Sequence, residues 1–204
     1  PNEAVRTRAA EELETLDFDE PSSQPNAQAL LRMLEDGSAD VRRSAVSTAA
    51  SVVRKCQHST GVALRRKLRW RLFSDDDDDV AMCAAQCLAA MGEPGVVHLA
   101  SVVMHANLHV NIVGDESKKL FEYVLKHPQL AVRSAGNPYL RGQLIALKVL
   151  AGLNDPLVYS VFVAALQDAT PAVRIEAARF LKSHKGPSAF PALVELLKTE
   201  RSTE

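Results

Sequence analysis

The strongest chemical feature of this sequence is a run of basic side chains without any acidic residue. Residues 42–71 carry nine lysines and arginines, a local charge of +9, whereas the whole chain has a net charge of −1. Trp70 lies among the arginines of a helix expected over 61–73, and leucines at helical spacing give that helix a buried stripe. Such a basic surface can bind phosphates, an acidic protein partner, or acidic residues of the chain itself. The predicted contact residues are Arg65, Arg66, Arg69 and Trp70.

Acidic side chains that can neutralise the basic run lie nearby in the sequence. Residues 3–20 contain seven acids, and five consecutive aspartates, Asp75 to Asp79, follow the basic helix directly. Calcium loops space their carboxylates as D-x-D-x-D-G, and these aspartates are consecutive with no glycine after them. We therefore expect a solvated turn, with Asp40 and Asp79 as the caps of the helices that follow them.

Patterns with catalytic or metal-binding chemistry are weak. His105 and His109 are spaced as half of a helical metal site, with His98 seven residues before the pair, but no third ligand is evident and no H-E-x-x-H motif occurs. The sequence has no phosphate-binding loop, no dinucleotide fingerprint and no nucleophile elbow. It therefore predicts no catalytic residue, no metal site and no cofactor.

Composition favours an all-α protein. Among 204 residues there are 29 alanines and 25 leucines, both strong helix formers, and only ten aromatic residues. No window approaches the roughly 18 apolar residues of a membrane-spanning helix, and the start lacks the order of a secretory signal, so we expect a cytoplasmic protein without a membrane partner. Three cysteines cannot form a fully paired disulfide framework. Cys83 and Cys87, four residues apart, are predicted to be small buried apolar groups, and the third is Cys56.

Internal repeats supply the elements that position these residues. The ten residues from Ala4 match the ten from Ala172 at six positions, and steps of 36 and 39 residues separate Val5, Val41 and Val80. These steps are near the period of two-helix solenoid repeats, so each unit is helix, turn, helix. We expect helices near 2–16, 26–36, 39–55, 61–73, 77–91, 95–105, 115–127, 138–152, 156–167, 171–184 and 188–199. Between Val80 and Val173 two repeat registers compete, one from Ala131 and one from Pro138.

The repeats resemble HEAT repeats, in particular the short HEAT-like repeats also found in phycobilin lyases. The resemblance rests on Leu34–Ala50 and Leu166–Leu181, and more weakly on Ala4–Leu13 and Asp75–Leu88. It implies an all-α, right-handed α-solenoid of about five two-helix repeats. We expect one repeat domain over 1–204, whole or as a piece of a longer solenoid, with an irregular repeat around 106–138. In the family, turn aspartates and second-helix arginines form a ladder, which implies structural roles for Asp36, Arg42, Asp168 and Arg174. Ala81 departs from this pattern.

The resemblance implies a protein-interaction module that binds a partner on the concave face of the solenoid, without chemistry of its own. It is expected to act as a scaffold, adaptor or chaperone-like protein, and the basic run favours an acidic partner. Two alternatives stay open. One is a nucleic-acid-binding protein or DNA glycosylase that uses residues 42–71, and the other is a tetrapyrrole carrier of the phycobilin-lyase type. The nearly neutral chain counts against the first of these alternatives.

Overall fold

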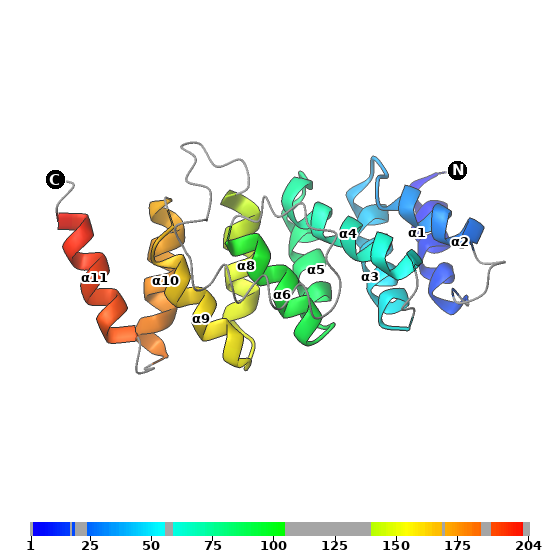
Figure 1. Cartoon of the computed structure of the whole chain (residues 1–204). Coiled ribbons are helices and arrows are strands. Elements are labelled where there is room, and N and C mark those ends of the chain that lie inside the picture. Colours follow the sequence, from blue (N-terminus) through cyan, green and yellow to red (C-terminus); the bar gives the residue numbers. More distant parts are fainter. Residues whose placement is uncertain are drawn as a thin grey trace. The chain divides into compact units, whose positions relative to one another are not determined.

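All regular structure in the described residues of this computed structural model is helical (Figure 1). The model describes residues 2–16, 18, 24–55, 59–104, 140–168, 170–184 and 189–201. No helix within these ranges is long and apolar enough to cross a membrane. The helices are α1 (Glu3–Glu12), the 3-10 turn η1 (Leu13–Thr15), α2 (Gln24–Met33), α3 (Ala39–Lys55), α4 (Ser59–Ser74), α5 (Asp78–Ala89), α6 (Glu93–Val103), α8 (Leu140–Ala151), α9 (Pro156–Ala165), α10 (Pro171–Ser183) and α11 (Ala189–Arg201).

The predicted all-α class and the α-solenoid type of fold are confirmed. Each expected helix that falls in the described ranges is present, with ends that differ by a few residues at most from the prediction, apart from the first, whose last turn is the separate turn η1. The helix expected over 115–127, the register from Ala131 and the irregular repeat around 106–138 lie outside the described residues. So do the first two residues of the register from Pro138, whose later residues fall in α8.

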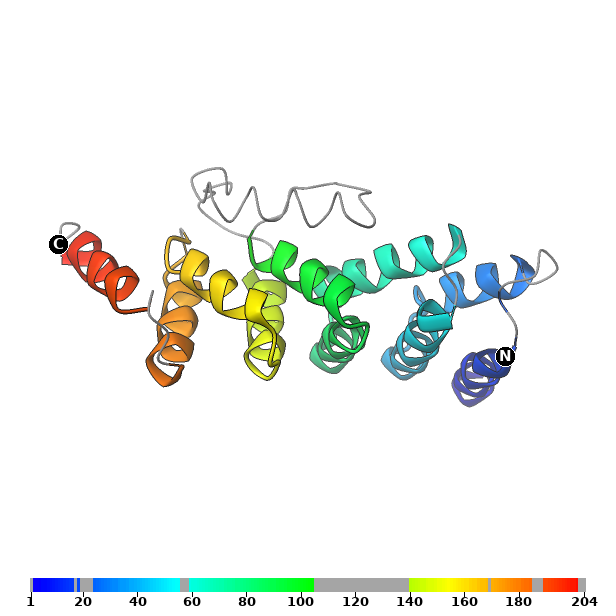
Figure 2. The ribbon, with the colours of Figure 1, turned by 60° about the horizontal axis from the view of Figure 1, so that its bottom comes forward.

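The chain divides into two compact units, residues 1–95 and 96–204, with α6 crossing the boundary. In the first unit, α1, α3 and α5 lie side by side, and α2 and α4 pack on them as a second layer (Figure 2). In the second unit, α10 packs on α8, α9 and α11. The expectation of one domain over the whole chain stays a prediction.

Alanines and valines at the repeat positions allow the second helix of each repeat to pack closely on its neighbours. Val41 and Val80 are fully buried, as are Ala45 and Ala84 four residues after them. The small alanine side chains let helix backbones approach each other, and the valines fill the remaining space. Val5, at the same position in α1, is 55% exposed. The buried stripe predicted for α4 is confirmed, and it consists of Leu64, Leu68 and Leu72.

The second unit uses the same positions and adds aromatic packing. Val173, Ala177 and Leu181 are the buried residues of α10. The ring of Phe162 in α9 stacks on that of Phe180 in α10 with centroids 3.8 Å apart. Stacked aromatic pairs add to the free energy of burial, so this pair fixes α9 against α10.

A glycine at the start of α6 tests how tightly the first unit is packed. A Cβ atom on Gly95 would lie 1.6 Å from the carbonyl oxygen of Leu88, so a side chain there forces the backbone to move. We expect Gly95→Ala to lower the free energy of unfolding by about 1–3 kcal/mol, as over-packing typically does. Gly37→Ala is the control, because a Cβ there meets nothing within 4 Å, and its effect should stay within about 0.5 kcal/mol. Urea denaturation followed by circular dichroism measures both, and equal effects would contradict the packing described here.

Candidate protein-interaction surface

An aspartate in the turn between the two helices of a repeat organises each of three described turns. Asp36, Asp75 and Asp168 lie three residues before the first residue of α3, α5 and α10. Each accepts a hydrogen bond at Oδ1 from the backbone N–H two residues later, at 2.9, 3.1 and 2.7 Å. This local bond closes the turn and leaves the rest of the carboxylate free to accept a side chain.

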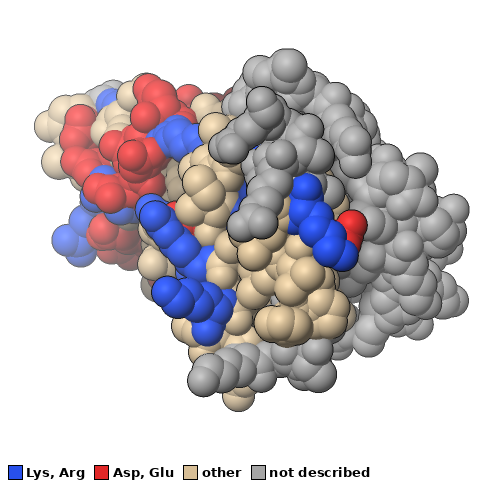
Figure 3. All heavy atoms as spheres, turned by 90° about the vertical axis from the view of Figure 1, so that its left-hand side faces the viewer, with Lys and Arg blue, Asp and Glu red and all other residues tan. Residues whose placement is uncertain are grey.

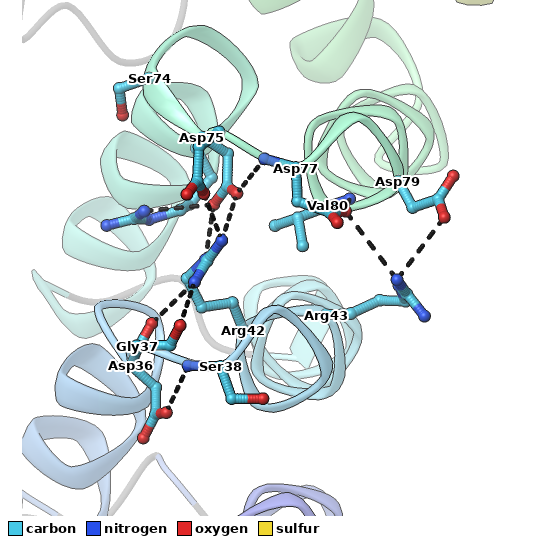
Figure 4. A network of polar contacts seen from close by, with 12 residues as sticks. Asp36, Gly37, Ser38, Arg42, Arg43, Ser74, Asp75, Asp77, Asp79 and Val80 are labelled. Carbon is cyan, nitrogen blue, oxygen red and sulfur yellow. Dashed lines mark hydrogen bonds and ion pairs between the residues drawn. The ribbon is translucent and has the colours of Figure 1, made fainter.

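Arginines of one repeat bind the turn aspartate of the next. Arg6 in α1 forms a two-pronged contact with Asp36, at 2.7 and 2.9 Å. Arg42 in α3 binds Asp75 in the same way, at 2.9 and 2.8 Å, and also donates to Asp76 at 2.6 Å (Figure 4). Fork-to-fork contacts of this kind combine charge with two parallel hydrogen bonds. They connect α1 to the α2–α3 turn and α3 to the α4–α5 turn.

The same arginine also holds the turn of its own repeat. The Nη1 atom of Arg42 donates to the backbone carbonyls of Asp36, at 2.9 Å, and Gly37, at 3.2 Å. Arg174 in α10 donates to the carbonyl of Asp168 at 2.9 Å. Arg42 therefore contacts Asp36 in the same way as Arg174 contacts Asp168. These are the four residues that the resemblance placed in a ladder.

The ladder residue occupies the fourth position of each second helix. These positions are Arg6, Arg42, Ala81, Gln143 and Arg174. Gln143 in α8 is fully buried, and its amide lies 2.7 Å from the carbonyl oxygen of Val103 and 3.4 Å from Asp168 Oδ2. Sequence reasoning missed Arg6, Asp75 and Gln143 as ladder members. The six-of-ten match between α1 and α10 contained the signal for Arg6, whereas a glutamine in place of an arginine gave no signal.

Both predicted helix caps are wrong by two residues. The cap of α5 is Asp77, whose carboxylate accepts from the N–H of Val80 at 2.9 Å, and Asp79 lies inside the first turn. Asp40 is likewise the second residue of α3, and the side chain before the helix is Ser38. Both aspartates still face the positive end of a helix, and both contact Arg43, at 3.3 Å from Asp40 and 3.6 Å from Asp79.

Four of the nine basic side chains in residues 42–71 are neutralised by acidic residues of the chain. Arg42 and Arg71 bind Asp75, whose side chain is fully buried, and Arg43 contacts the exposed aspartates. Lys67 binds Glu35, and this contact lowers the pKa of that carboxyl. Internal pairing therefore accounts for much of the basic run, including two of the five basic residues of α4.

The predicted contact residues form one stripe on α4. Arg66 and Trp70 are exposed, Trp70 by 52%, and Arg65 is half-buried beside them. The Arg69 guanidinium lies over the ring of Phe73, 5.8 Å from its centroid, and burial lowers the pKa of Arg69. Neither Arg65 nor Arg66 has an ion pair within the described ranges, in contrast to Lys67 and Arg71 on the same helix. The structure thus brings an aromatic ring and unpaired cations together on one helix face.

A shallow groove lies on the other layer of the first unit, between α1 and α3. Small and charged side chains line it: Glu3, Ala4, Thr7, Arg8, Glu11, Asp40, Arg43, Ser44 and Ser47. The basic stripe belongs to α4 and therefore does not line this groove. Beyond Ser47, on α5, Cys83 and Cys87 are half-buried, so the prediction that both are buried apolar groups is wrong.

Comparison with known families agrees with this geometry. Residues 118–204 match the family model of HEAT repeats. These residues, in the second unit, are therefore similar to HEAT repeats. Searches of curated proteins and of solved structures found no significant match.

Within the described part of the chain, no group of three or more His, Cys, Asp and Glu side chains is arranged to hold a metal ion. The aspartate run instead binds arginines, and His105 and His109 lie outside the described residues. Figure 3 shows acidic side chains with basic ones directly beside them on one face of the molecule.

The buried Arg42–Asp75 contact between two repeats is testable by removing one partner. Arg42→Met keeps the side-chain volume but leaves the fully buried Asp75 short of its main donor. Loss of one partner of a buried ion pair should reduce the free energy of unfolding by about 3–5 kcal/mol. The control is Arg43→Met, whose contacts are exposed and should contribute about 1 kcal/mol or less. Urea denaturation of both variants decides, and similar losses would refute the special role of Arg42.

The Asp75 carboxylate also predicts a dependence on pH. Burial raises its pKa, but hydrogen bonds from Arg42, the Asp77 backbone and Arg71 outweigh burial, and the net pKa is lowered. A lowered folded-state pKa stabilises the fold above the unfolded pKa of about 4, and this stability is lost as pH falls through the folded value. The stability difference between the wild type and Asp75→Asn should therefore shrink as pH falls from about 5 towards 2. A difference that stays constant over this range, measured by urea denaturation, would contradict the assignment.

Proposed function

We propose that this chain is a protein-interaction scaffold whose α4 stripe binds an acidic segment of a partner protein. HEAT repeats are commonly protein-interaction scaffolds. The observation that supports the proposal is the division of charge on α4. Lys67 and Arg71 are used by the chain itself, whereas Arg65, Arg66 and Trp70 face outward beside them. An adaptor or chaperone-like role in the cytoplasm is the form of this function that we expect.

The chemistry of the stripe suits carboxylates on a peptide or domain surface. Arginine forks match carboxylates in geometry and charge, and Trp70 supplies a large ring with about half of its surface still exposed to solvent. Exposed tryptophan and arginine side chains are the types that contribute most to affinity at protein interfaces. Arg69, held over Phe73, fixes the aromatic end of the stripe.

Nucleic acid is the competing ligand, because arginines and an aromatic ring also bind phosphates and bases. The ion pairs within the chain make this ligand less suitable. They use Arg42, Arg43, Lys67 and Arg71, which leaves a short stripe on α4 and two cations at the end of α3, whereas nucleic acid needs an extended basic surface. The experiment below separates the two ligands.

We expect the variant Arg65→Glu/Arg66→Glu/Trp70→Ala to lose binding to an acidic partner. Arg69 is left in place because it is half-buried and its guanidinium lies over Phe73. Truncation of one interface tryptophan alone often weakens binding by about 30-fold, so the combined loss should be at least that large. The probe is a fluorescent acidic peptide, and a duplex and a single-stranded oligonucleotide are titrated in parallel at several salt concentrations. Pull-down from lysate, with and without nuclease, then identifies the natural partner.

The matched control is Lys148→Glu/Lys182→Glu, which changes net charge equally at exposed positions of the second unit. It should keep its affinity for the acidic peptide. Equal weakening by both variants would reduce the effect to net charge and refute a site on α4. Oligonucleotide binding that is lost in the α4 variant and falls steeply with salt would instead assign the stripe to nucleic acid.

A further inference from the structure

Two cysteines lie together on α5 at the surface that continues from the α1–α3 groove. Cys83 and Cys87 are four residues apart and therefore neighbours on one helix face. Both are half-buried, so solvent reaches the site while part of each side chain is shielded. The hydroxyl of Ser47, across the α3–α5 contact, lies 3.7 Å from the sulfur of Cys83.

The surroundings of Cys83 stabilise its thiolate. The neighbouring Cys87 thiol and the Ser47 hydroxyl, 3.7 Å away, can each donate a hydrogen bond to a Cys83 thiolate, and the guanidinium of Arg43 adds positive charge. The donor from Cys87 is the largest of these influences, and together they outweigh burial and lower the pKa of Cys83 to about 6. The same contact raises the pKa of Cys87, which keeps its proton. Reactive cysteines occupy partly exposed, electropositive sites of this kind.

The helical spacing opposes a disulfide between the two residues. Side chains four apart on a helix have Cβ atoms about 5–6 Å apart, whereas a disulfide needs about 3.5–4.5 Å. Closing such a bond would require distortion of α5, whose buried face packs on α3 and α4. Cys87 can therefore activate Cys83 by hydrogen bonding but is poorly placed to displace a group attached to it.

We propose that Cys83 is a modification site, a nucleophilic thiol that exchanges with low-molecular-weight disulfides and retains the adduct. The Cys83 thiolate attacks one sulfur of the disulfide, and a new sulfur–sulfur bond forms as the old one breaks. The departing thiolate takes a proton from water. The disulfide is the oxidant, and its two electrons leave with the released thiol. The adduct then lies beside Ser47 and Arg43, at the end of the groove.

The first test identifies the product. The full chain carrying Cys56→Ser is incubated with glutathione disulfide and analysed by intact mass and peptide mapping. We expect one glutathione per chain, on Cys83, and none on the Cys83→Ser variant. A product lighter by two hydrogens, which is the internal disulfide, would overturn the proposal. So would an adduct found mainly on Cys87.

The second test uses the pH dependence of the rate. At pH 6, a pKa of 6 instead of 8.5 raises the thiolate fraction about 150-fold, and the lower intrinsic nucleophilicity reduces the gain to about tenfold. At pH 8.5 a thiol of pKa 6 is fully ionised and one of pKa about 8.5 is half ionised, so the more basic thiol, with its more nucleophilic thiolate, reacts up to about tenfold faster. Cys87→Ala should therefore react more slowly than its Cys56→Ser parent at pH 6 and faster at pH 8.5.

A crossing of the two rate profiles is a signature that altered access alone does not produce. Ser47→Ala should shift the profile in the same direction by less, because Ser47 is the weaker donor. Circular dichroism checks that each variant keeps its helices. Parallel profiles, with Cys87→Ala slower or faster at every pH, would refute activation by Cys87. An unchanged profile in both variants would refute the proposal as a whole.

Discussion

The structure depends on a contact between the fourth residue of a second helix and the turn aspartate of the next repeat. In the Arg42–Asp75 rung the carboxylate is fully buried, so its charge requires a partner with fixed geometry. Arg42, Arg71 and the Asp77 N–H supply that partner set. The turn can close only in the position where the preceding repeat presents its arginine, which makes the contact a constraint on register as well as a source of stability.

This constraint also decides which charges remain for function. A count of basic residues in the sequence treats the nine between 42 and 71 as equivalent, but the ladder and the aspartate run use those closest to the turns. Of the other basic side chains, Arg65, Arg66 and Arg69 are on α4, where Trp70 is exposed, and Arg54 and Lys55 are exposed at the end of α3. The candidate surface on α4 is thus part of the basic charge that remains once the paired side chains are set aside. The sequence alone does not show which side chains are paired.

The helices could be predicted because alanine-rich periodicity and the turn residues agree at each repeat, and α3 has the bounds expected for it. The cap of α5 could not, because any of five consecutive aspartates satisfies the preference for a carboxylate before a helix, and backbone geometry selects Asp77. Gln143 was missed because the ladder pattern expects an arginine at this position. The glutamine instead contacts its neighbours through hydrogen bonds of an uncharged amide. Cys83 was misassigned because periodicity places a residue on a helix face but does not say that small polar residues of α3 lie opposite.

The two candidate sites of the first unit are physically separate. The basic stripe belongs to α4, whereas Cys83 and Ser47 lie at the contact between α3 and α5, in the layer that also forms the groove. Arg43 takes part in three features of this unit. It lines the groove, its positive charge acts on the Cys83 thiol, and it contacts Asp79 of the aspartate run. An anionic adduct on Cys83 would compete for this arginine with the exposed aspartates and leave the buried Arg42–Asp75 rung intact. Modification would therefore change the charge of the groove while the packing of the repeats stays the same.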